Sequence, residues 1–122
     1  MNTVFLVTYF WNNMENDDLY MDGHDVLGIF DSYDNAYAAI QRVKEQHEEF
    51  CEKSLEFANG TINLLYGPRR FEDYTESKGI DGVVSIAWNT MSNDFGYSVE
   101  HFFQIKEVKL NDYSAETFDL PL

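Results

Sequence analysis

The sequence predicts an α+β fold, an antiparallel sheet of four or five strands with one long helix packed on one face. Short apolar runs rich in β-branched and aromatic residues lie near both ends of the chain. Between them, residues 33–58 form a single long segment whose apolar side chains recur at helical spacing. The 122 residues suffice for one domain, 1–122, in which residues 111–122 are expected to form a loosely docked tail.

Two strands are expected first. Residues 3–11, TVFLVTYFW, are too continuously apolar for a half-exposed edge strand. Residues 26–30, VLGIF, predict a second strand that runs antiparallel to the first. The polar residues between them, 12–25, are expected to form the hairpin loop, whose acids include Asp17, Asp18 and Asp22.

The helix is expected to run from Tyr33 to Ala58, with Ser32 as its N-cap and Asn59-Gly60 as its stop. Because His47 and Ser54 fill an apolar face poorly, a break near its middle is an alternative. At about 100° per residue, one side collects the residues expected to face the core: Ala36, Ile40, Val43, His47, Phe50, Ser54 and Phe57. The opposite side collects Asp34, Glu45, Glu48, Glu49, Glu52 and Glu56.

The second half of the chain predicts three further strands. Residues 61–66, TINLLY, form a short one, followed by a Gly-Pro turn at 67–70 and a loop at 71–82 with room for one helical turn. Residues 83–88 and 97–110 are expected to pair as a hairpin. The apolar parity changes between Ile105 and Val108, which predicts a bulge or bend there.

The charge of the chain restricts its partners. Its 22 acidic and 8 basic residues give a net charge of −14, and no Lys or Arg precedes Arg42. A field of this sign repels nucleic acid and anionic membranes and attracts basic proteins, although the same charge also serves solubility. A single cysteine, Cys51, excludes an internal disulfide and indicates the cytoplasm, or the host cytoplasm if a phage encodes the protein. Residues 1–11 lack the basic start of a signal peptide.

Metal and cofactor binding are not expected. The soft metal ligands are His24, His47, His101 and Cys51, of which His47 and Cys51 stand four apart on the predicted helix. That spacing can place two ligands on one metal. Nothing nearby in the sequence supplies a third ligand, so we expect a hydrogen-bonded core histidine and a small core thiol instead.

Calcium binding and catalysis also lack a motif. With Gly23 as the sixth residue of an EF-hand loop, Tyr20 falls third and Ile29 twelfth, where oxygen ligands are needed. Casual cation binding by the acids of residues 15–25 stays open. The chain has no glycine-rich phosphate loop. Carboxylate pairs are expected by chance in so acidic a chain, and we expect no enzyme.

A row of acids follows one side of the predicted helix. It consists of Glu45, Glu48, Glu49, Glu52 and Glu56. The row spans roughly 16 Å at ~1.5 Å per residue, or one negative charge per ~3.3 Å. That spacing is close to the ~3.4 Å between phosphates along one DNA strand. The alternative is an ordinary solvated helix face.

Three phrases, VFLVTYFW, VLGIFDSYDNAYAAIQRVKE and FFQIKEVKLND, resemble small uncharacterised domains of bacteria and phages. In those domains a strand leads through a Gly-x-Phe-x-Ser phrase into a helix, and a closing strand completes the sheet. The matching residues are Gly28, Phe30, Ser32, Ala36, Ala39, Ile40, Ile105, Val108 and Leu110. The resemblance does not cover residues 52–97 and implies no activity. In size and charge the chain is also similar to phage anti-restriction and anti-CRISPR proteins.

These observations predict a non-catalytic acidic protein that occupies a basic, nucleic-acid-binding surface of a partner, as a DNA mimic inhibiting a defence nuclease would. The partner-binding surface is expected to combine the helix row with the hairpin acids: Glu45, Glu48, Glu49, Glu52, Glu56, Asp17, Asp18 and Asp22. One alternative is a small structural or regulatory module that binds a protein through aromatic patches or its tail. Another is a hydrolase or metal enzyme that uses scattered carboxylates.

Overall fold

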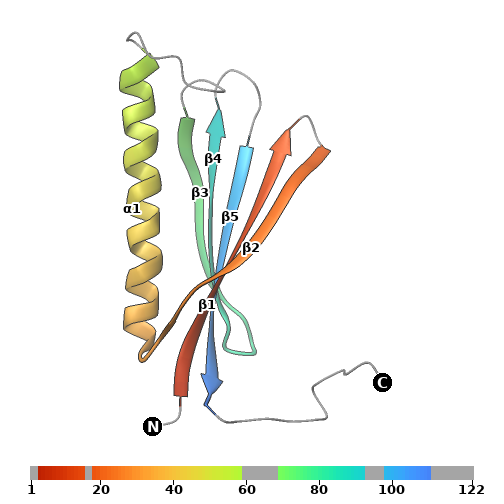
Figure 1. The fold of residues 1–122 in the computed structure, drawn as a ribbon, viewed down its shortest axis with the longest axis vertical. Coiled ribbons are helices and arrows are strands. Elements are labelled where there is room, and N and C mark those ends of the chain that lie inside the picture. The colour runs from red at the N-terminus through yellow and green to blue at the C-terminus, as the bar shows by residue number, and fades with distance from the viewer. Residues whose placement is uncertain (1–2, 16–17, 59–68, 93–97, 111–122) are drawn as a thin grey trace.

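A computed structural model describes residues 3–15, 18–58, 69–92 and 98–110. Its elements follow in the order β1 (Thr3–Glu15), β2 (Asp18–Phe30), α1 (Tyr33–Ala58), β3 (Arg69–Lys78), β4 (Val84–Ser92) and β5 (Ser98–Lys109). The strands form one antiparallel sheet in the order β2-β1-β5-β4-β3, and α1 runs alongside it (Figure 1). The α+β class with a five-stranded antiparallel sheet is therefore confirmed.

The hairpin of β1 and β2 is much longer than the sequence predicted. Its ladder continues from Phe5↔Phe30 to Glu15↔Asp18, so the expectation that residues 12–25 form a loop was wrong. Polar residues form strands here because β1 is also paired on its other side, with β5, as far as Met14↔Ser98. Two neighbouring strands supply its backbone hydrogen bonds, and this tertiary context overrides weak β-propensity.

The core is a buried cluster to which α1 and the sheet both contribute. Ala36 and Ile40 of α1 join a buried cluster with six sheet residues, which are Val7, Val84, Ile86, Trp88, Phe103 and Ile105. The register places these six on one face of the sheet, because they are cross-strand partners or stand two apart along a strand. We call this the inner face of the sheet and the opposite side the outer face.

Helix α1 has the bounds that the sequence predicted and is continuous over them. Its N-cap is also confirmed, because the backbone N–H of Asn35 donates to Ser32 Oγ at 3.1 Å. The side-chain amide of Asn35 donates to Asp31 Oδ1 at 2.8 Å, which adds a second local bond at this end. Residues 59–60, the predicted stop, lie outside the described residues.

Among the described side chains of the predicted core face of α1, one is misplaced, and the side chain of Phe57 lies outside the described residues. Phe50 is 50% exposed, whereas Cys51 and Ser54 are buried. Cys51 is eleven residues after Ile40 and so returns to nearly the same angle around the helix, while Phe50 falls roughly 80° away. The ring of Phe50 instead lies 5.8 Å from the guanidinium carbon of Arg69.

The second half of the sheet corrects two further expectations. Residues 71–78, predicted as a loop, belong to β3, which pairs with β4 across a bulge between Glu72 and Thr75. The bulge hid the strand, because it lets Phe71 and Tyr74, three residues apart, both contact Trp88. The bulge predicted between Ile105 and Val108 was also wrong, since β5 pairs with β1 there without a shift. The predicted strand at 61–66 lies outside the described residues.

Candidate functional site

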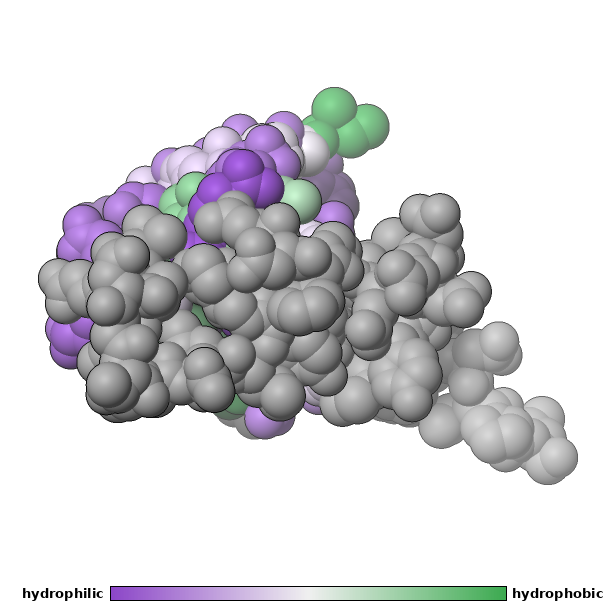
Figure 2. Space-filling view, turned by 90° about the horizontal axis from the view of Figure 1, so that it is seen from above, coloured by the Kyte–Doolittle hydropathy of each residue, from purple (hydrophilic) through white to green (hydrophobic). Residues whose placement is uncertain are grey.

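The predicted acidic row lies on the solvent side of α1. Glu45, Glu49 and Glu52 are exposed, and Glu48 is partly covered. Glu56 belongs to the same helix, but its side chain lies outside the described residues. Seen from above, the described residues at the left edge, where α1 lies in Figure 1, are mostly hydrophilic (Figure 2). A long, exposed and largely polar helix surface is therefore present.

Two lysines partly compensate the charge of this row. Lys44 Nζ lies 2.8 Å from Glu48 Oε1, and Lys53 Nζ lies 2.8 Å from Glu49 Oε1. The hydrogen bond and the charge of Lys53 lower the pKa of Glu49. The other acids of the row that the structure describes, Glu45 and Glu52, have no such ion pair among the described residues.

The hairpin residues Asp18 and Asp22 belong to a strand distant from α1. Asp18 is the cross-strand partner of Glu15, and Asp22 that of Asn12, near the tip of the β1–β2 hairpin. Figure 1 shows this tip at the same end of the molecule as the C-terminal part of α1, with β3, β4 and β5 between them. Asp17 lies outside the described residues. The backbone at Asp18 and Asp22 thus lies apart from α1, across three strands of the sheet.

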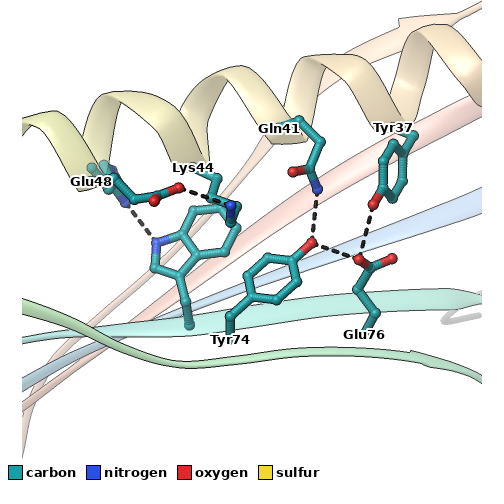
Figure 3. Close-up of polar contacts among 8 residues, drawn as sticks. Tyr37, Gln41, Lys44, Glu48, Tyr74 and Glu76 are labelled. Carbon is teal, nitrogen blue, oxygen red and sulfur yellow. Dashed lines mark hydrogen bonds and ion pairs between the residues drawn. The ribbon is translucent and has the colours of Figure 1, made fainter.

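Hydrogen bonds fasten the N-terminal half of α1 to β3, one to two turns before the acidic row begins (Figure 3). Gln41 Nε2 donates to the hydroxyl of Tyr74 at 2.8 Å, and that hydroxyl donates to Glu76 Oε2 at 2.8 Å. Tyr37 donates to the same carboxylate oxygen at 2.9 Å. Burial, with Glu76 adding to it, raises the pKa of Tyr74, so this phenol stays protonated as a hydrogen-bond donor.

In a second polar cluster, Trp88 and His101 are buried and His47 is partly covered. Trp88 Nε1–H donates to His47 Nδ1 at 2.8 Å, and the ring centroids of His47 and His101 are 4.4 Å apart. His101 Nδ1 lies 2.6 Å from the hydroxyl of Tyr9, and its Nε2 lies 3.1 Å from Thr90 Oγ1. The sequence predicted a buried, hydrogen-bonded His47 but missed His101, whose partners are distant in sequence.

Burial keeps this inner cluster neutral. Desolvation lowers the pKa of His101 to about 3, helped by the nearby His47 and Arg69, and it also lowers the pKa of His47. Within the described ranges, no three His, Cys, Asp or Glu side chains are placed to hold a metal ion. With both ring nitrogens of His101 hydrogen-bonded, the cluster serves packing better than proton transfer to a substrate.

Cys51 is buried, as predicted for a small core thiol. Burial raises the pKa of its thiol; Arg69 opposes that effect and Glu48 adds to it. The Ser54 hydroxyl one turn later donates to the carbonyl of Cys51 at 2.7 Å. A buried thiol with a raised pKa is a poor nucleophile.

The outer face carries a feature that the sequence did not reveal. Phe10 and Phe102 lie there side by side and line a shallow depression of about 410 Å³ together with Asn12, Glu100 and Gln104. Periodicity alone could have placed these residues on one face. Their meeting across β1 and β5 depends on the register, which the sequence did not fix.

The comparisons with known proteins give no relative from which a function could be inferred. Among the described residues, no helix combines the length and apolar composition that a membrane crossing needs. The resemblance to small bacterial and phage domains stays a prediction. No family model, curated protein or solved structure matches this chain.

Proposed function

We propose that this chain is a non-catalytic binding protein whose acidic surface occupies a basic, nucleic-acid-binding surface of a partner protein. α1 packs across the inner face of the sheet and presents its row of acids to the partner. In this proposal the protein is a DNA mimic that inhibits a nuclease of host defence. The exposure of Glu45, Glu49 and Glu52 along one side of a continuous 26-residue helix carries the proposal.

The anchoring of α1 supports this role. Contacts of Tyr37, Gln41 and His47 hold the helix to β3 and β4 at successive turns. A row of charges on a rigid element keeps its spacing when a partner approaches, which favours recognition of a partner with regularly placed cations. The net charge of −14 adds long-range attraction toward a basic protein.

The two lysine pairs are compatible with this proposal. The Lys53–Glu49 pair is an exposed i,i+4 pair, a type worth only about 0.3–0.5 kcal/mol, whereas the Lys44–Glu48 pair is partly covered. Arginines of a partner can therefore take over Glu49 at small cost. The row then presents its exposed carboxylates to the partner surface.

The test is recovery of partners from a host lysate at low and high salt. The row variant changes Glu45, Glu49 and Glu52 to Gln, and the control changes Asp34, Asp81 and Glu107 to the corresponding amides. Both variants remove three exposed negative charges. We expect the row variant to lose a salt-sensitive, basic partner that the control retains. Equal losses would show that net charge and not the row is responsible.

A second candidate function rests on exposed apolar residues. Ile29 is 65% exposed and Val26 51% exposed, both on the edge strand β2. Uncharged apolar side chains on a sheet edge are typical of protein–protein contacts. A small structural or regulatory module would use them, and its partner would remain bound at high salt in the same recovery experiment.

A further inference from the structure

The lining residues of the depression on the outer face lie in three alternate register rows of β1 and β5. The rows are Asn12↔Glu100, Phe10↔Phe102 and Thr8↔Gln104, and no bulge interrupts them. The neighbours Tyr9, His101 and Phe103 stack together on the inner face. Strand alternation therefore directs Phe10, Phe102 and the flanking polar side chains outward.

The lining combines two aromatic rings with a carboxylate and two amides. The ring centroids of Phe10 and Phe102 are 6.2 Å apart with the planes tilted by 54°, and Phe10 is 37% exposed. His24 of β2 stacks on Phe10 at 5.6 Å, which extends the aromatic surface. Glu100 is the one charged side chain among the lining residues, and it is exposed.

A second carboxylate approaches this region from β3. Asn89 of β4 is the cross-strand partner of Glu100, and its Nδ2 donates to Asp73 Oδ2 at 3.1 Å. Asp73 sits in the bulge of β3 with φ of 60°, a left-handed conformation that Asp tolerates better than most residues. The bulge thus brings the Asp73 carboxylate to the outer face beside the row of Glu100.

We propose that this depression binds the side chain of an arginine that a basic partner protein presents. This inference rests on the proposed function for the basic character of the partner, but it uses a different surface from the acidic row. Phe10 and Phe102 supply aromatic faces for a cation, and Glu100 supplies the opposite charge.

Arginine suits these groups better than lysine. Its planar guanidinium stacks on aromatic rings and carries five N–H donors in a fixed fork, which can reach Glu100 while meeting the amide oxygens of Asn12 and Gln104. A lysine ammonium is compact and strongly hydrated, so it gains less from an open aromatic floor.

The test uses the full chain and two blocked tripeptides, acetyl-Gly-Arg-Gly-amide and acetyl-Gly-Lys-Gly-amide. Two-dimensional ¹H–¹⁵N spectra are recorded during titration, with the side-chain amides of Asn12 and Gln104 as reporters. We expect saturable shifts centred on the depression, with the arginine peptide binding about two- to fivefold more tightly than the lysine peptide. Glu100→Gln and Phe102→Leu should each weaken arginine binding about two- to fivefold.

The control for these variants is Glu107→Gln, an exposed residue of β5 outside the depression, which should leave the titration unchanged. Thermal unfolding of each variant checks that the fold is retained, and Phe102→Leu keeps an apolar side chain for this reason. Shifts spread over all acidic regions, equal for both peptides, would overturn the proposal, as would absence of saturable binding. Because no partner is needed, this result is independent of the lysate experiment on the acidic row.

Discussion

At the scale of the residue, the most consequential side chain is a histidine that folding keeps neutral. His101 is buried, and hydroxyl groups occupy both of its ring nitrogens. The sequence indicated that His47 is buried, because helical spacing places it beside apolar residues. It could not indicate that Trp88 is the donor to His47 or that His101 lies against it, because these contacts join residues 41 and 54 positions apart.

The low pKa of His101 predicts a loss of stability in mild acid. Its pKa is about 3 in the folded protein, against an ordinary value of 6.5 that the unfolded chain recovers. Between these values the unfolded state binds a proton that the folded state excludes, so stability falls as the pH falls below 6.5. By pH 5 the loss from this group alone should be about 2 kcal/mol. Urea unfolding at pH 7.5 and pH 5 measures it.

The matched variant for this prediction is His101→Gln, which keeps hydrogen-bonding groups but does not titrate. Between pH 7.5 and pH 5, its free energy of unfolding should fall by about 2 kcal/mol less than that of the original chain. His47, which is packed beside it, contributes in the same direction in both proteins because burial lowers its pKa too. An identical pH dependence in the two proteins would contradict the neutral, buried state of His101.

Two residues of α1 should differ in their contribution to stability. Ile40 is fully buried, whereas Phe50 is half exposed. Ile40→Ala should cost about 2–5 kcal/mol because it leaves a cavity in the core. Phe50→Ala should cost only about 1 kcal/mol, since part of its ring is already in water. Urea unfolding of both variants checks the assignment, and comparable losses would place Phe50 in the core after all.

At the scale of the element, strands with regular alternation and the helix could be predicted, and the bulged strand could not. The bounds of α1 follow from an N-cap at Ser32 and a periodic pattern that runs to Ala58. β3 was missed because its two inward rings, Phe71 and Tyr74, are three residues apart. The depression could not be predicted either, because its residues come from opposite ends of the chain.

The bulge of β3 makes its own prediction. Asp73 adopts a φ of 60°, where an L-residue with a Cβ is strained and glycine is not. Asp73→Ala and Asp73→Gly both remove the hydrogen bond to Asn89, so the difference between them isolates the backbone. The Asp73→Ala variant should be less stable than the Asp73→Gly variant by roughly 0.5–1 kcal/mol in urea unfolding. Equal stabilities would mean that the bulge relaxes to an ordinary conformation.

At the scale of the whole molecule, the acidic row and the aromatic depression belong to different elements. The acidic row belongs to α1, whose Ala36 and Ile40 pack on the inner face, and the aromatic depression lies on the outer face. Composition predicted the sign and size of the charge. It could not predict that the lysines of α1 are paired with Glu48 and Glu49, or that the hairpin acids lie on a separate part of the molecule.

This separation predicts different kinetic effects for the two surfaces on a partner recovered from lysate. Neutralising Glu45, Glu49 and Glu52 should mainly slow association, and the effect should shrink at high salt, because exposed charges act over distance and are screened. Phe102→Ala should mainly speed dissociation, with little dependence on salt, because it removes a short-range contact. Surface plasmon resonance at two ionic strengths measures both rate constants.

A variant that combines the two sets of changes tests whether the two surfaces act independently. Surfaces on opposite sides of a sheet share no contacts, so their effects on the binding free energy should add in the combined variant. Additive effects would mean that one partner wraps around the molecule or that two partner copies bind. If only one set of changes alters binding, the other surface serves a different partner or none. Both sets of changes could instead alter the same rate constant with the same salt dependence. That result would contradict the assignment of association to the acidic row and of slow dissociation to the depression.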